Sequence, residues 1–306
     1  METHHDIVLP KCFGWVGLGA MGWPMAKQLL KNTSAKLVIY DVDQSTLHRF
    51  AREASERVEI ASSARQVADE SECVFTIVPE GKHVKEVYLT PDTGLLAGKT
   101  SGKTFIDCST IDIETSLATG EAVMSSDPEA AVHFFDCPVS GGTAGAAKGT
   151  ITFMVGMAAD DPRFPFIHAI LSTMGSSINP MGGKGLGLAA KLSNNYLSGI
   201  IALATSEAMS IGMKLGIDPK VLSDTFDKGT GANWVNRAMN PVPGVCPDAA
   251  TSKGYEGGFK DMKLAAEVAT QTGVKLVLGE SAIAAYSSAA ADSRYRDKDS
   301  RVVYQW

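Results

Sequence analysis

The order of elements between residues 13 and 41 constrains the fold of this chain more than any other feature. A short apolar run, Phe13–Val16, leads into a glycine-rich turn, Gly17–Gly22, and a helical pattern follows over Trp23–Lys31. A β-branched run, Lys36–Tyr40, comes next and ends at Asp41. Strand, turn, helix and strand in this order form a βαβ unit. We therefore expect an α/β fold whose first domain is a Rossmann-type, doubly wound sheet.

The glycine spacing in this unit is typical of a dinucleotide site. The first glycine allows a tight turn, the second lets the backbone approach a pyrophosphate, and the third lets the helix pack close to its strand. The N–H groups at the start of the helix favour phosphate. The alternative is a βαβ unit with an ordinary glycine turn. The predicted cofactor residues are Gly17, Leu18, Gly19, Ala20, Met21 and Gly22.

The acidic residue after the second strand predicts which dinucleotide binds. Asp41 follows the turn at the distance where a carboxylate can accept hydrogen bonds from the adenosine ribose. It would also repel the extra phosphate of NADP, and Asp43 would add to that repulsion. No arginine occupies positions 41 to 44. We therefore predict NAD as the cofactor.

Two later apolar runs, Glu72–Pro79 and Lys103–Thr110, are predicted to be further strands. In open α/β sheets the ligand crevice lies at the carboxyl ends of the strands. The polar ends of both runs should therefore approach the nicotinamide half of the cofactor. An alternative for the two hydroxyls is capping of the helix predicted over Ile111–Val123. The residues concerned are Val78, Pro79, Ser109 and Thr110.

A Ser-Gly-Gly tripeptide follows the next predicted strand, His133–Val139. Ser140, Gly141 and Gly142 would present one hydroxyl and two unhindered backbone N–H groups, which suit a carboxylate. The alternative is a plain turn. Strands are also predicted over Ile151–Gly156 and Ser176–Pro180.

The pattern changes near residue 180, where we place a boundary between domains 1–180 and 181–306. After a glycine-rich link, Gly185–Met213 reads as one long helix whose only charges are Lys191 and Glu207. Small and apolar residues occupy nearly every face, so we expect the helix to be buried. Helical patterns over Pro219–Lys228, Lys260–Thr272 and Leu276–Ala291, with a loop over Pro241–Gly258, complete a domain that should be all-helical.

Lys191 is the candidate catalytic residue of the long helix. Burial disfavours an ammonium, which makes a lysine that exchanges protons plausible. Asn195 lies four residues on, one turn along the same face. The alternative is a lysine whose stem packs while its head reaches water.

Composition narrows the classes of partner. The net charge is −6 without a basic run, which argues against nucleic acid and anionic membranes as partners. The uncharged run Leu192–Ser206 is too short and too polar to span a bilayer. Five scattered cysteines without a CxxC or zinc-like spacing predict a reducing compartment and no metal site. We expect an intracellular protein, in the mitochondrial matrix if a presequence was removed and otherwise in the cytoplasm.

Several stretches together resemble the β-hydroxyacid dehydrogenase family, most closely its branch that acts on 3-hydroxyisobutyrate. The resemblance covers about residues 12–306, and two shorter motifs, NPVPG and YEGGF followed by KDMKLA, extend it into the last third. The stretches that carry it are GWVGLGAMGWPMA, IVPEGKHVKEVY, FIDCSTID, DCPVSGGTAGAAKGTITFMVG and GLGLAAKLSNN.

The resemblance implies a role for each candidate residue. Lys191 would be the general acid/base, and Asn195 would hold the substrate and fix Lys191. Ser140, Gly141 and Gly142 would bind the substrate carboxylate. Lys260 and Asp261 would approach the nicotinamide and the substrate. The implied reaction is NAD-dependent oxidation of 3-hydroxyisobutyrate to methylmalonate semialdehyde, a step of valine catabolism, by a homodimer or homotetramer.

Other functions stay open. Within the family these are reduction of tartronate or succinic semialdehyde and oxidation of serine or 3-hydroxypropionate. Imine reductases share this architecture, but their equivalent of Lys191 is usually replaced, so Lys191 argues against imine reduction. A chromatin reader and a silent NAD-binding protein are alternatives outside catalysis. The chain departs from the family at one point, because Phe259 runs straight into Lys260 where relatives have several intervening residues.

Overall fold

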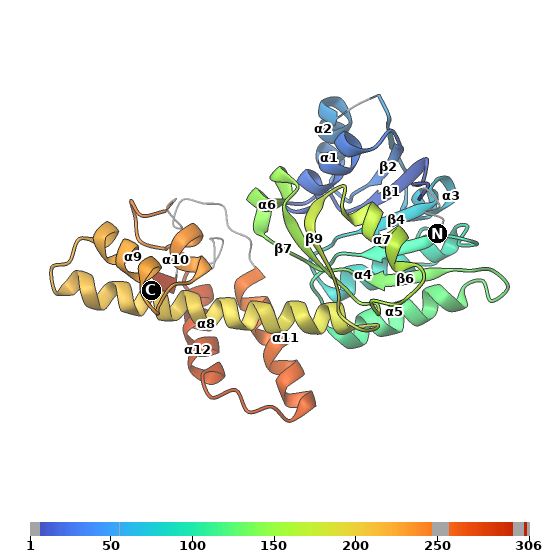
Figure 1. Cartoon of the computed structure of the whole chain (residues 1–306). Coiled ribbons are helices and arrows are strands. Elements are labelled where there is room, and N and C mark those ends of the chain that lie inside the picture. Colours follow the sequence, from blue (N-terminus) through green and yellow to red (C-terminus); the bar gives the residue numbers. More distant parts are fainter. Residues whose placement is uncertain (1–6, 55, 247–256, 296–302, 305–306) are drawn as a thin grey trace, which may run out of the picture. The chain divides into compact units, whose positions relative to one another are not determined.

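A computed structural model describes residues 7–54, 56–246, 257–295 and 303–304 of the chain (Figure 1). The chain divides into two compact units, Met1–Lys191 and Leu192–Trp306. The boundary predicted after residue 180 falls at the end of strand β9, whereas the two units meet inside helix α8.

The first unit contains a six-stranded parallel sheet with the order β3-β2-β1-β4-β5-β6. The strand order reverses next to β1, which is the switch point where doubly wound sheets bind ligands. This confirms the fold class predicted from the sequence. The strands are β1 (Cys12–Val16), β2 (Lys36–Tyr40), β3 (Val58–Ile60), β4 (Cys73–Thr76), β5 (Thr104–Asp107) and β6 (His133–Asp136).

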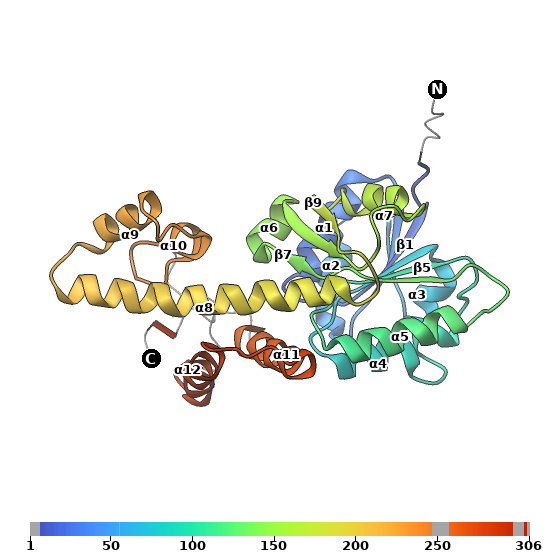
Figure 2. The same ribbon diagram turned by 60° about the horizontal axis from the view of Figure 1, so that its bottom comes forward.

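Helices cover both faces of this sheet (Figure 2). Successive strand residues point to opposite faces. Trp15 therefore belongs to one buried cluster with Met25 and Phe50, and Val16 belongs to another with Val67 and Tyr88. The helices are α1 (Gly22–Asn32), α2 (Gln44–Ala54), α3 (Ala64–Glu70), α4 (Gly81–Leu89) and α5 (Ile113–Ser125), with a 3₁₀ turn at Leu95–Ala97.

A second, three-stranded sheet follows with the order β7-β8-β9. The single strand predicted over His133–Val139 is wrong, because the chain leaves the large sheet after Asp136 and pairs Val139 with Phe153. Pro138 lies between the two strands and has no N–H to continue a ladder. The elements of this part are β7 (Val139–Ser140), α6 (Gly142–Lys148), β8 (Ile151–Val155), α7 (Phe164–Leu171) and β9 (Gly175–Pro180).

Helix α8 (Leu186–Lys214) is the long helix predicted from the sequence. The expectation that it is buried on nearly every face is wrong for the single chain. Leu197 is 57% exposed and Ile211 is 64% exposed. By length and composition alone α8 could cross a membrane, contrary to the sequence argument, and only 28% of its most apolar window is buried. Core helices of soluble proteins satisfy the same criteria, so the absence of a membrane partner stays a prediction.

The described part of the second unit is helical, as predicted. Asp218 caps α9 through the backbone N–H groups of Lys220 and Val221. Helix α11 packs closely on α8, since a Cβ added at Gly199 would lie 2.6 Å from Met262 Sδ. The predicted loop Pro241–Gly258 ends too late, because α11 already begins at Gly257, and residues 247–256 lie outside the described residues. The elements are α9 (Pro219–Lys228), α10 (Trp234–Met239), α11 (Gly257–Thr272) and α12 (Gly279–Ala291).

Candidate active site

The glycine turn has the shape that the fingerprint requires. Gly17 has a φ of +98°, and a Cβ there would lie 2.1 Å from the Ile77 carbonyl oxygen. A Cβ at Gly22 would lie 2.1 Å from the Gly17 carbonyl oxygen. A Cβ at Gly19 would meet no atom within 4 Å. Two of the glycines therefore permit close packing, and the third leaves open space beside the turn.

The start of α1 fits a diphosphate. Among the described residues, no side chain at the Met21 N-cap bonds to the helix, and its first turn carries no acidic residue. The first N–H groups of a helix have no partner within the helix and favour anions. The glycine turn and the helix start thus provide a place for the pyrophosphate of a dinucleotide.

Asp41 lies against the glycine turn. The Leu18 N–H donates to Asp41 Oδ2 at 2.6 Å, and the Asp43 N–H donates to Asp41 Oδ1 at 2.8 Å. The carboxylate therefore lies beside the turn, as a ribose-binding residue must. Asp43 instead accepts bonds from Thr46 and Ser45 at the start of α2, and these bonds lower its pKa to about 2.

Two of the residues predicted at the nicotinamide half, Val78 and Ser109, are joined to each other. The Val78 N–H donates to Ser109 Oγ at 2.9 Å, and the Ser109 hydroxyl donates to Asp107 Oδ1 at 2.6 Å. The cap of α5 is Asp112, which accepts the Thr115 N–H at 2.7 Å. The Ser109 hydroxyl therefore links two strand ends and does not cap α5.

Asp107, which the sequence analysis did not single out, is the shared hydrogen-bond acceptor in this group. It is 1% exposed, and the Thr76 hydroxyl also donates to its Oδ1 at 2.7 Å. Burial raises its pKa above the ordinary value, although these hydrogen bonds oppose the shift. Its Oδ2 accepts no hydrogen bond within the described part of the chain. The sequence feature that could have identified Asp107 is its charge inside the apolar run Lys103–Thr110.

A second buried carboxylate, Asp136, lies in register with Asp107 on the neighbouring strand. It is 3% exposed and accepts the N–H groups of Gly185 and Leu188, each at 2.9 Å. Burial raises its pKa to about 6, and the two hydrogen bonds partly offset this effect. Sequence reasoning missed this residue too, because it was read as part of a plain strand.

Asp136 should make the free energy of unfolding depend on pH. Its folded-state pKa, about 6, lies above the 3.8 of an ordinary aspartate, so the folded state takes up the proton first. The resulting stabilisation is fully present below pH 3.8 and is lost as pH rises through about 6. In urea titrations, wild type should gain about 1.4 kcal/mol over Asp136→Asn from about pH 8 to about pH 5. A difference that does not change with pH would contradict this.

The Ser-Gly-Gly tripeptide lies at the start of α6. Gly141 and Gly142 have positive φ values of 124° and 63°, and both are exposed. Ser140 ends β7 and pairs with Thr152 of β8. Farther along β8, the strand lies against α8, because a Cβ at Gly187 would be 2.4 Å from the Met154 carbonyl oxygen. Packing thus connects the tripeptide's small sheet with the start of α8.

Lys191 is the sixth residue of α8 and is 9% exposed, so the expected loss of contact with water is confirmed. Leu188 and Leu192 beside it are fully buried. In the second unit, the Asn195 amide donates to Asp261 Oδ2 at 2.6 Å, and Lys260 Nζ lies 3.9 Å from Asp261 Oδ1. The structure therefore joins Asn195 to Asp261, and Asp261 in turn pairs with Lys260.

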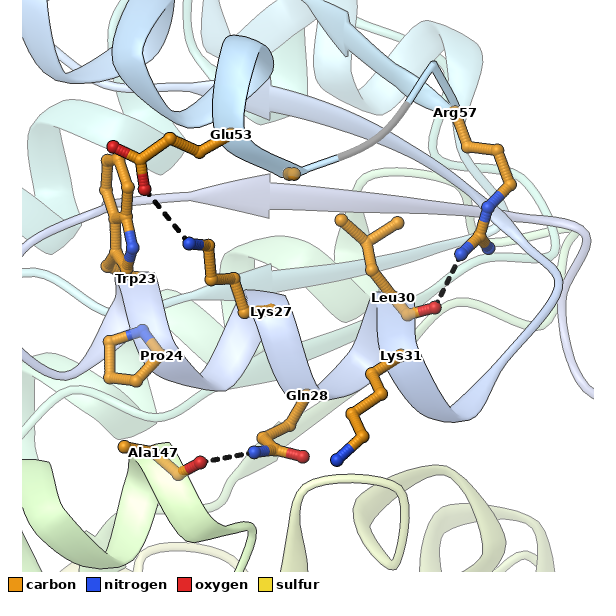
Figure 3. A pocket seen from close by; sticks show the side chains of 10 residues that line it. Trp23, Pro24, Lys27, Gln28, Leu30, Lys31, Glu53, Arg57 and Ala147 are labelled. Carbon is orange, nitrogen blue, oxygen red and sulfur yellow. Dashed lines mark hydrogen bonds and ion pairs between the residues drawn. The ribbon is translucent and has the colours of Figure 1, made fainter.

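A pocket of about 580 Å³ lies outside this set of residues (Figure 3). It is lined by α1, the end of α2 and α6, and includes Trp23, Lys27 and Glu53. Lys27 and Glu53 form an ion pair at 3.0 Å across it. In the described ranges, no group of three or more His, Cys, Asp or Glu residues is placed to hold a metal.

Comparison with known proteins decides the family. Residues 12–183 match the family model for the NAD binding domain of 6-phosphogluconate dehydrogenase. Residues 185–306 match the one described as NAD-binding of NADP-dependent 3-hydroxyisobutyrate dehydrogenase. A probable mitochondrial 3-hydroxyisobutyrate dehydrogenase of Dictyostelium discoideum is 37% identical, covering 97% of this chain and 90% of the relative. The chain belongs to the β-hydroxyacid dehydrogenase family.

This membership makes the chain an NAD-dependent hydroxyacid dehydrogenase. An NAD-dependent L-serine dehydrogenase of Pseudomonas aeruginosa is 34% identical, covering 96% of both chains. A solved structure of Mycobacterium tuberculosis 3-hydroxyisobutyrate dehydrogenase with L-serine has a TM-score of 0.83 and 29% identity. It covers 97% of this chain and 99% of that one. The family therefore includes proteins named for two different hydroxy acids.

Proposed function

We propose that this dehydrogenase oxidises 3-hydroxyisobutyrate to methylmalonate semialdehyde with NAD, as an intracellular step of valine catabolism. The observation that carries the proposal is a lysine, Lys191, 9% exposed on the long helix of a chain with a dinucleotide fold. The names of several relatives, among them proteins of Dictyostelium discoideum and Pseudomonas aeruginosa, support this substrate.

The proposed chemistry assigns one task to each group. NAD, when bound, takes a hydride from the carbon that carries the hydroxyl. Lys191 Nζ accepts the hydroxyl proton, so the alcohol becomes an aldehyde. The Ser140 hydroxyl and the N–H groups of Gly141 and Gly142 hold the substrate carboxylate. Asn195 holds the substrate, and the Asp261 carboxylate fixes the Asn195 amide.

L-Serine is the second candidate substrate, because one relative is named for it and one similar structure contains it. The two acids share a terminal hydroxyl and a carboxylate and differ at the carbon between them, which bears a methyl group or an ammonium. We would follow NADH formation with 3-hydroxyisobutyrate, L-serine, 3-hydroxypropionate, glycerate and 4-hydroxybutyrate. The largest kcat/KM for 3-hydroxyisobutyrate supports the proposal, and the largest value for L-serine replaces it.

Preference for NAD over NADP should depend on Asp41. Its carboxylate would hydrogen-bond the ribose and repel a 2′-phosphate, and hydrogen bonds to charged groups contribute about 1.5–3 kcal/mol. Asp41→Ser should therefore lower the ratio of kcat/KM for NAD to that for NADP by about 10–100-fold. Asp43→Ser is the comparison variant, because Asp43 caps α2 and would only add to the repulsion, so it should lower this ratio less than Asp41→Ser does. An equal change in both variants would remove Asp41 from cofactor selection.

We also propose a homodimer or homotetramer. Leu197, Ile211 and Leu215 are 57%, 64% and 79% exposed in and just after α8 of the single chain. Apolar side chains gathered in this way favour association. Multi-angle light scattering would give the mass in solution, and a monomer at micromolar concentration would contradict the proposal.

A further inference from the structure

The start of α8 is held from outside the helix by one carboxylate. The first N–H groups of a helix need partners that the helix does not supply. Asp136, at the end of β6, accepts the Gly185 N–H through Oδ1 and the Leu188 N–H through Oδ2. Each carboxylate oxygen therefore takes one N–H, and the pair fixes both the height and the rotation of the first turn.

The surroundings leave the Asp136 carboxylate no alternative position. A Cβ at Gly156 would lie 1.8 Å from Asp136 Oδ1, and a Cβ at Gly187 would lie 2.8 Å from Oδ2. The Gly156 N–H also donates to the Asp136 carbonyl oxygen at 2.8 Å. Strand β8 and helix α8 thus close around the carboxylate, and both approach it through glycines.

Lys191 follows this anchored turn directly. It lies three residues after Leu188, which places it above Leu188 on nearly the same face of the helix. Leu188 is fully buried, so this face points into the first unit. A shift in the first turn of α8 would therefore move Lys191.

We propose that Asp136 is a positioning residue that sets the place of Lys191 by holding the first turn of α8 against the sheet. The proposal rests on the proposed function of Lys191 as the proton acceptor. Asp136 lies behind the backbone of α8 and acts through the helix. A displacement of about 1 Å at a reacting group can lower the rate about 100-fold, so the position of the first turn matters for turnover.

Asp136→Asn tests the proposal. Asparagine has nearly the same shape but only one oxygen, so it can accept only one of the two N–H groups. We expect kcat to fall about 10–100-fold, with the Kd for NAD unchanged, because the predicted cofactor residues lie elsewhere. Asp218→Asn is the control for loss of charge alone at a helix start, since Asp218 accepts two backbone N–H groups through one oxygen, Oδ1, which asparagine retains. It should keep wild-type kcat, and equal kcat in both variants overturns the proposal.

The double variant separates positioning from a merely structural role. If Asp136 acts through Lys191, Lys191→Ala with Asp136→Asn should be no slower than Lys191→Ala alone. A further fall in kcat overturns the proposal, because the carboxylate would then act by another route. Full activity of Lys191→Ala would instead overturn the proposed function. The two failures are therefore distinguishable.

Wild-type enzyme provides a second test should Asp136→Asn not fold. In the direction of aldehyde reduction, Lys191 must donate a proton. Protonation of Lys191 at low pH therefore does not stop the reaction. The ionisable groups that interact with Asp136 are Asp107 on β5 and the thiol of Cys137, and burial keeps this thiol protonated by raising its pKa. Lys191 is the first ionisable residue of α8. We expect kcat for reduction to fall below about pH 6 with circular dichroism unchanged. A flat or rising kcat down to about pH 5 overturns the proposal.

Discussion

Lys191→Ala should lower kcat by about 10²–10⁴-fold, while the Kd for NAD changes little. General acid/base groups contribute this much because they move a proton in the transition state itself. Lys191 is suited to the task by its 9% exposure, which keeps bulk water from replacing it. Because the interaction with the moving proton exists only in the transition state, kcat and kcat/KM should fall together.

Two further variants test whether the fall in kcat is specific to proton transfer by Lys191. Lys191→Arg keeps the positive charge and most of the stem, but a guanidinium does not release its proton, so this variant should be nearly as slow as alanine. Lys184→Ala removes an exposed lysine from the segment just before α8 and should keep wild-type kcat. Near-normal turnover of either Lys191 variant would remove this residue from the mechanism. Stopped-flow measurement of NADH formation gives the rate of the chemical step directly.

The features that could be predicted from the sequence are those defined by short spacing. The turn Gly17–Gly22 and the carboxylate of Asp41 belong to one βαβ unit, so a local pattern was enough to place them together. The Lys36–Tyr40 strand has the predicted bounds for the same reason. Burial of Lys191 could also be predicted, because apolar and small residues surround it in the sequence.

The contacts that the two buried carboxylates make across the sheet could not be predicted, because these partners are distant in the sequence. Asp136 binds backbone N–H groups 49 and 52 residues away, and no side-chain pattern marks a backbone donor. Asp107 accepts the hydroxyl of Thr76, 31 residues away, and is joined to Val78 through Ser109. The exposed face of α8 was missed for a different reason. An apolar helix surface predicts that the surface is buried, but it does not tell whether residues of the same chain bury it.

Gly17→Ala should lower the free energy of unfolding by about 2–5 kcal/mol, which is large for a single methyl group. Two costs add at this position. A residue with a Cβ held at positive φ costs about 1–2 kcal/mol, and overpacking costs a further 1–3 kcal/mol. The added Cβ would lie 2.1 Å from the Ile77 carbonyl oxygen, a backbone atom next to β4 that cannot rotate away. Urea titration followed by circular dichroism measures the loss.

Two other glycines separate the backbone and packing costs of Gly17→Ala from the role of the glycine turn in NAD binding. Gly102 also has a positive φ, +70°, but a Cβ there meets nothing within 4 Å, so Gly102→Ala should show the backbone cost alone.

Gly19→Ala should change stability by less than about 0.5 kcal/mol, because its Cβ also meets no atom. That Cβ would occupy the space where the pyrophosphate approaches, so the Kd for NAD should rise at least about tenfold. Unchanged NAD binding in Gly19→Ala would place the diphosphate elsewhere, and a stable Gly17→Ala would show that the turn can shift to relieve the contact.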